Sequence, residues 1–152
     1  MDVRRITLSE IIAAVGGALL ALSVFVKWYE ARPENPNANI NGMKGVVPAW
    51  DAHENLRFFF LLAALAPIVL LYIVLRDHEL SWPRGELTAV IGIIAFGLVV
   101  YQGVIDRPGE PPSEIELEIG WWMALLGTIL IIVGGSYRAS TTDRPRKPPG
   151  VI

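Results

Sequence analysis

Histidine and carboxylate side chains close together in a sequence are the residues with which a protein most readily holds a metal ion. Asp51, His53 and Glu54 form such a group, and both residue types are common zinc ligands. A zinc or iron site needs at least three ligands, and the second histidine, His78, is expected on the opposite side of a membrane, as argued below. An aspartate followed three residues later by a glutamate is also a helix-capping pattern. We therefore expect Asp51 and Glu54 to begin a helix, and we predict no metal site.

Glu10 is the other carboxylate that stands next to an apolar run. The residues Thr7-Leu-Ser-Glu10 form a capping box, in which Thr7 accepts a hydrogen bond from the Glu10 amide and the Glu10 carboxylate accepts one from the Thr7 amide. This pattern favours a helix start over a functional glutamate.

The sequence offers little else for catalysis. It contains no cysteine, which excludes disulfides, thiolate chemistry and iron–sulfur clusters, and it has no glycine-rich phosphate loop. Inside the apolar runs there is no ionisable acid or base; the polar residues there are Ser23, Tyr72, Tyr101, Gln102 and Thr128. An intramembrane ionisable residue is the usual pointer to a proton path or ion site. We therefore predict a protein that is not an enzyme and that needs no cofactor.

Composition and hydropathy indicate which elements position these residues. Hydrophobic residues make up 53% of the 152-residue chain and charged residues only 18%, with the charges gathered between long apolar runs. The runs predict four membrane-spanning helices at about residues 8–26, 54–75, 86–105 and 119–137. Residues 1–137 then form an all-α, four-helix transmembrane domain, and residues 138–152 form a basic, proline-rich tail.

Pro67 lies near the middle of the second predicted span. A proline there frees the carbonyl of Ala63 and bends the helix. Transporters line such breaks with polar groups, whereas the neighbours of Pro67 are apolar, so we favour a structural kink.

The two outer loops, on the side of the membrane opposite the termini, have the pattern of short strands. Residues 40–47 contain the turn pair Asn41-Gly42, and residues 114–119 alternate glutamate with a hydrophobic residue. We expect these two segments to pair in a small extracytoplasmic β element. The ladder Glu114, Glu116 and Glu118 then either faces solvent or recognises a basic partner.

Charge counts predict the orientation of the chain. With four spans, eight of the 13 Lys and Arg residues fall on the side of the termini, which places both termini in the cytoplasm of a multi-pass protein of the cytoplasmic membrane. The tail residues Arg138, Arg144, Arg146 and Lys147 would lie beside anionic lipid headgroups. No basic patch with interleaved aromatic residues indicates nucleic acid.

Two helices carry seams of small residues that allow close helix packing. Gly120, Gly127 and Gly134 recur every seven residues in the last span, and Ala13, Gly17 and Ala21 recur every four in the first. The two seams either pack on each other within one chain or join subunits, and the sequence favours neither arrangement.

Three segments carry a resemblance to known proteins: SEIIAAVGGALLALSVFVKWY, PAWDA and IGWWMALLGTILIIVGG. In these segments and their spacing the chain resembles a group of small bacterial four-span proteins with no assigned activity, which implies architecture only. The layout is also similar to that of claudins, although the hallmark tryptophans and paired cysteines of that family are absent.

These patterns lead to two functional hypotheses. The first is a non-enzymatic membrane protein that acts by assembly, as a homo-oligomer or as an accessory subunit of a larger membrane complex, in contact with membrane lipids. The second is a channel or transporter whose pore forms only between subunits, lined by Tyr101, Gln102 and the outer glutamates.

Overall fold

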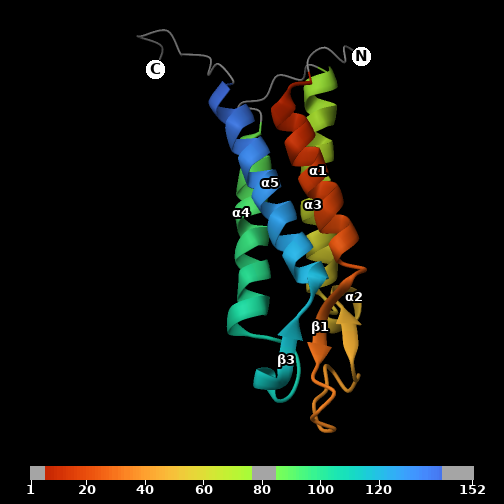
Figure 1. Cartoon of the computed structure of the whole chain (residues 1–152). Coiled ribbons are helices and arrows are strands. Elements are labelled where there is room, and N and C mark those ends of the chain that lie inside the picture. The colour runs from red at the N-terminus through yellow and green to blue at the C-terminus, as the bar shows by residue number, and fades with distance from the viewer. Residues whose placement is uncertain (1–5, 77–84, 142–152) are drawn as a thin grey trace.

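The fold is a bundle of four long helices with a small sheet at one end, as seen in a computed structural model that describes residues 6–76 and 85–141 (Figure 1). The elements, in chain order, are α1 (Leu8–Ser23), β1 (Lys27–Ala31), β2 (Val46–Pro48), α2 (Ala49–Ala52), α3 (Leu56–Arg76), α4 (Glu86–Val100), the π-helical turn η2 (Tyr101–Ile105), the 3₁₀ turn η3 (Pro112–Glu114), β3 (Ile115–Leu117) and α5 (Ile119–Thr141).

The long helices are arranged around α5, which packs against both α1 and α4. Helix α1 packs on its other side against α3, and contacts between α3 and α4 close the bundle. Figure 1 shows that α1 begins and α5 ends at the same end of the bundle, while the sheet and α2 lie together at the other end. We call the sheet, α2 and their connecting loops the head.

Within residues 6–76 and 85–141, three helical segments are long and apolar enough to cross a membrane: Leu56–Arg76, Glu86–Ile105 and Ile119–Thr141. Helix α1 is apolar but has only 16 residues. It ends at Ser23, before the predicted limit at residue 26, because the chain turns there into β1. Four apolar helices are therefore present, and a complete crossing by α1 stays a prediction.

The predicted β element is present, but its central strand was not predicted. The sheet is antiparallel with the order β2-β1-β3, and Tyr29 of β1 pairs with Val47 on one side and Leu117 on the other. Direct pairing of the two outer segments was wrong because β1 lies between them. The sequence Lys27-Trp28-Tyr29 was interpreted as the interfacial end of a span, since these residue types are common there.

The Asn41-Gly42 pair forms the predicted tight turn. Both residues have positive φ angles, 51° and 80°, and the flanking residues Ile40 and Met43 form an antiparallel bridge. Asparagine and glycine tolerate this left-handed backbone better than other residues do.

The glycine seam of α5 packs on α1 within the same chain. A Cβ atom on Gly127 would lie 2.8 Å from the carbonyl oxygen of Gly16, and one on Gly134 would lie 2.7 Å from the amide nitrogen of Ala13. A Cβ on Gly120 would collide with the ring of Trp28. The described structure therefore uses this seam internally, as the first of the two predicted arrangements requires.

The seam predicted on α1 divides between two neighbours. Ala13 faces α5, but the second small residue on that face is Gly16 rather than Gly17. Gly17 faces α3, where a Cβ would lie 2.6 Å from the carbonyl oxygen of Ala64 and 3.1 Å from Cγ of Pro67, and Ala21 is half-buried beside the core. Assigning all three residues to one seam was wrong, because Gly16 and Gly17 are consecutive and the helix turns about 100° between them.

Pro67 lies inside α3 and is buried against α1. Its ring fills the space left by Gly17. The bend of α3 at this point stays a prediction.

We predict that Gly127→Ala destabilises the folded chain by about 1–3 kcal/mol, because the new methyl group must separate α1 from α5. Gly97→Ala in α4 is the matched control, since a Cβ there meets nothing within 4 Å. Unfolding of the purified protein by titration with a denaturing detergent would measure both. Equal stabilities of the two variants would contradict this packing.

Candidate functional site

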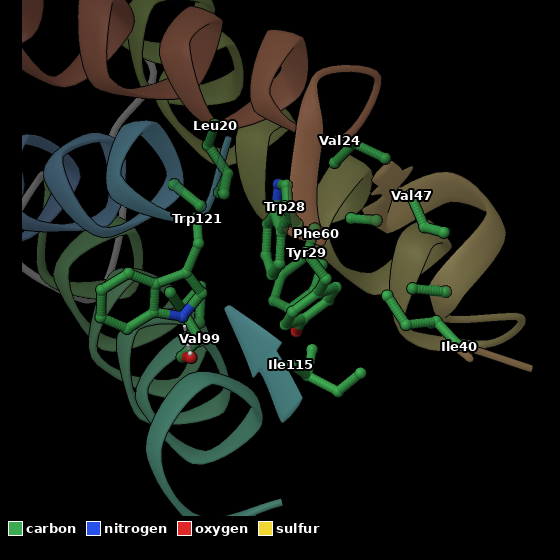
Figure 2. Packing of buried hydrophobic residues seen from close by; sticks show 14 of the residues in the cluster. Leu20, Val24, Trp28, Tyr29, Ile40, Val47, Phe60, Val99, Ile115 and Trp121 are labelled. Atoms are coloured by element: carbon green, nitrogen blue, oxygen red, sulfur yellow. Dashed lines mark hydrogen bonds between the residues drawn. The ribbon is translucent and has the colours of Figure 1, made fainter. Parts of the chain in front are cut away.

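The head and the bundle share one hydrophobic core. Trp28 and Tyr29 of β1 are fully buried, and they lie beside Phe60 of α3 (Figure 2). The indole N–H of Trp28 donates to the carbonyl of Ser23, 2.8 Å away, at the end of α1. The ring of Trp28 packs 5.3 Å from that of Phe60, centroid to centroid. The head is therefore fixed to the helices by buried side chains.

The end of α4 is attached to the same core. Trp121 of α5 donates its indole N–H to the carbonyl of Val99, 2.8 Å away, as the dashed line in Figure 2 marks. Here α4 widens into the π turn η2, and Gly103 of that turn lies directly against the indole, where any side chain would collide. The bulky indole thus occupies space that only glycine leaves open. π turns inside helices are often found at functional sites.

A buried polar pair lies inside the head. The hydroxyl of Tyr29 is 2.9 Å from Nε2 of His53 and 3.3 Å from the carbonyl oxygen of Gln102, which lies within reach of the hydroxyl proton. A phenol has one proton, so when it donates to Gln102 the imidazole must donate to the phenol oxygen. Burial lowers the pKa of His53 to about 4 and raises the pKa of Tyr29. Both side chains are therefore neutral near pH 7.

The group Asp51, His53 and Glu54 does not converge. His53 points into the core, whereas Asp51 and Glu54 are exposed. No set of three candidate metal ligands was found among residues 6–76 and 85–141, and His78 lies outside these ranges. The predicted cap is wrong: Asp51 lies within the single turn of α2, whose N-cap is Pro48, because the chain bends again at His53 before α3 begins.

The acidic ladder of residues 114–118 has partners in its own chain. Glu118 pairs with Lys27 at 2.9 Å, Glu116 with Nε of Arg32 at 2.7 Å, and Glu114 with Nη1 of Arg32 at 3.8 Å. The hydrogen bond and charge of Lys27 lower the pKa of Glu118. Residues 27–32, which comprise β1 and the residue after it, therefore supply the cations. This arrangement was not predicted, because Lys27-Trp28-Tyr29 was interpreted as the end of a span.

At the opposite end of the bundle, Glu10 has two roles. The predicted capping box is confirmed, with the Thr7 amide donating to Oε2 of Glu10 at 2.8 Å. Oε1 of Glu10 forms an ion pair with Nε of Arg138 at 2.8 Å; the Glu10 side chain is 0% exposed and that of Arg138 15%. The cap explained the position of Glu10, but no sequence pattern indicated a partner on α5.

The position of Arg138 corrects the predicted tail. Helix α5 continues to Thr141, so the boundary proposed at residue 137 falls inside the helix. Arg138 belongs to the bundle, where its side chain is directed to Glu10 rather than to lipid headgroups. The other predicted headgroup ligands, Arg144, Arg146 and Lys147, lie outside the described residues.

An open hollow lies beside α2 and the first turn of α3. It has a volume of about 560 Å³ and is lined by polar and charged groups together with Met43 and Phe58. The guanidinium of Arg57 contacts the rings of Trp50 and Phe58, 4.6 and 4.9 Å from their centroids, and these two rings also contact each other edge to face at 5.9 Å. Arg57 is not among the residues that the sequence singles out, because neighbouring residues of a helix, such as Arg57 and Phe58, are not expected to face each other.

Comparisons of the chain with protein-family models, with curated proteins and with solved structures gave no significant match. The fold itself defines a helical protein with three helices that are long and apolar enough for a membrane, carrying a compact β-containing head.

We predict that Glu10→Gln destabilises the fold although it preserves the capping box, since glutamine serves equally at that position. Removing one charge of a buried pair costs about 3–5 kcal/mol because the other charge stays buried. The thermal midpoint in detergent would measure the loss, and Glu110→Gln, at an exposed position in the head, is the control. A midpoint lowered no further than that of the control would contradict the pair's importance.

We predict that the head loses stability in acid through His53. Its pKa is about 4 in the folded chain and about 6.5 in an unfolded one. Between these values only the unfolded chain takes up the proton, so the stabilisation is complete above pH 6.5 and falls as the pH decreases towards 4. The full effect is about 3 kcal/mol.

Thermal unfolding of wild type and His53→Gln between pH 7 and 4.5 would separate this contribution from that of the carboxylates. The wild-type curve should fall more steeply with acid than the variant curve. Parallel curves would show that His53 does not titrate on unfolding.

Proposed function

We propose that this is a non-enzymatic integral membrane protein that acts by assembly, as a homo-oligomer or as an accessory subunit of a larger membrane complex. In this proposal all four long helices cross the cytoplasmic membrane, both termini are cytoplasmic, and the head lies on the outer surface. The distribution of Lys and Arg supports this orientation.

The observation that carries the proposal is the ordered loop of residues 32–45 between β1 and β2. Loops longer than about 12 residues are uncommon in compact domains and are usually functional when they are ordered. Ala38 and Ile40 anchor this loop in the core, and the backbone of Asn39 exchanges two hydrogen bonds with Glu110 across the head. Between these anchors and β1, Pro33, Glu34, Pro36 and Asn37 are exposed.

This arrangement moves the expected contact surface from the helices to the head. The glycine seam of α5 is filled by α1, and the glutamates of the ladder are paired with Lys27 and Arg32. The exposed part of the loop carries polar side chains on a fixed backbone, which reduces the entropy lost on binding a partner.

We do not propose the alternative of a pore between subunits. One of its candidate lining residues has another contact in the structure, since Glu116 forms an ion pair with Arg32. Conductance in liposomes containing the purified protein would revive that hypothesis.

We predict that the double substitution Pro36→Lys and Asn37→Lys abolishes assembly without unfolding the head, because the anchors Ala38 and Ile40 are kept. Cross-linking in the native membrane, followed by purification and mass spectrometry, would identify the neighbouring chains. Ser140→Lys with Thr141→Lys adds the same charge at exposed positions at the other end of α5 and should change nothing. A wild-type chain with no cross-linked neighbour would contradict the proposal.

A further inference from the structure

The proposed assembly gives no role to the open hollow beside α2. Its volume of about 560 Å³ lies within the range of small-molecule sites. Its lining includes one cation, Arg57, and two carboxylates, Asp51 and Glu54. Two amide and two apolar side chains complete the wall. A ligand that fits it should carry both an anionic and a cationic group.

The hollow lies at the level where the head meets the apolar helices. Phe58, which lines it, is in the first turn of α3 and is 51% exposed. Phe25, at the end of α1, is 58% exposed and stacks on Trp50 with 5.2 Å between ring centroids. Exposed aromatic rings at the ends of apolar helices are typical of the membrane–water interface. The hollow therefore opens where phospholipid headgroups lie.

Arg57 is held ready to bind an anion. Its guanidinium lies near the rings of Trp50 and Phe58 and donates one hydrogen bond from Nη1 to the carbonyl of Trp50 at 2.9 Å. A guanidinium has five N–H donors, so donors are left for a phosphate oxygen. Because the side chain is already fixed, little entropy is lost when it binds.

The two carboxylates select the other end of the ligand. Asp51 and Glu54 are exposed at the same hollow, whereas Glu116 and Glu118 are paired with Arg32 and Lys27. A primary ammonium can donate hydrogen bonds to these carboxylates, and a trimethylammonium cannot. A headgroup with net negative charge would be repelled by them.

We propose that the hollow binds the headgroup of a phospholipid with a phosphate and a primary ammonium, of the phosphatidylethanolamine type, from the leaflet on the head side. Arg57 binds the phosphate, Asp51 and Glu54 bind the ammonium, and the acyl chains run beside Phe58 along α3. This inference needs no partner protein, so it can hold or fail independently of the proposed assembly.

Native mass spectrometry of the full chain would test this binding directly. The protein is released from detergent micelles that contain equal amounts of phosphatidylethanolamine, phosphatidylcholine and phosphatidylglycerol, and the bound lipids are counted. The wild type should retain phosphatidylethanolamine in preference to the other two. The double variant Asp51→Asn with Glu54→Gln should lower the ratio of retained phosphatidylethanolamine to retained phosphatidylcholine by about tenfold. Glu34→Gln with Glu110→Gln changes two exposed glutamates elsewhere on the head and should keep it.

A second variant tests the contact between Arg57 and the phosphate. Arg57→Met should lower retention of both zwitterionic lipids, because it removes the phosphate ligand and keeps an unbranched apolar side chain beside the rings of Trp50 and Phe58. Thermal unfolding checks whether Arg57→Met is folded. If it is not, the carboxylate variant still tests the proposal, because Asp51 and Glu54 are surface residues. Equal retention of the three lipids by the wild type, or an unchanged preference in the carboxylate variant, would overturn the proposal.

Discussion

The close approach of the α1 and α5 backbones at Gly16 and Gly127 is the contact on which the other features of the structure depend. Neither helix has a side chain at this point, so the helices approach closely enough for backbone atoms to touch. The same register brings Glu10 to Arg138 at one end of the pair. At the other end it places α5 against Trp28, the residue that begins the head core. One packing register therefore fixes both ends of the protein.

Two tryptophans donate hydrogen bonds to backbone carbonyls near the ends of apolar helices. The last carbonyls of a helix have no partner within it, and leaving them unpaired in an apolar setting is costly. Trp121 donates to Val99 where α4 passes into the π turn, and Trp28 donates to Ser23 at the end of α1, whose carbonyl also accepts a hydrogen bond from the Val26 amide. Each indole fills the core with its ring and pairs a carbonyl with its N–H. Backbone carbonyls at the junction between the helices and the head can therefore be hydrogen-bonded without access to water.

Local patterns predicted the helices, the Asn41-Gly42 turn and the capping box at Glu10, because the residues that determine these features are neighbours in the sequence. Prediction failed where one sequence pattern is compatible with two different structures. Lys27-Trp28-Tyr29 has the composition of a membrane interface and also of a strand, and only the burial of both aromatic rings distinguishes them. The pairing of Glu10 with Arg138 joins distant residues and follows only from helix register.

The shortness of α1 has a consequence for the surrounding lipid. Its 16 residues span about 24 Å at 1.5 Å per residue, whereas a typical hydrocarbon layer is about 30 Å thick. If α1 crosses the membrane, a hydrocarbon layer that is thinner by several ångströms beside it would match its length. Such thinning would be confined to one side of the protein and would draw copies of the chain towards thinner regions of the membrane.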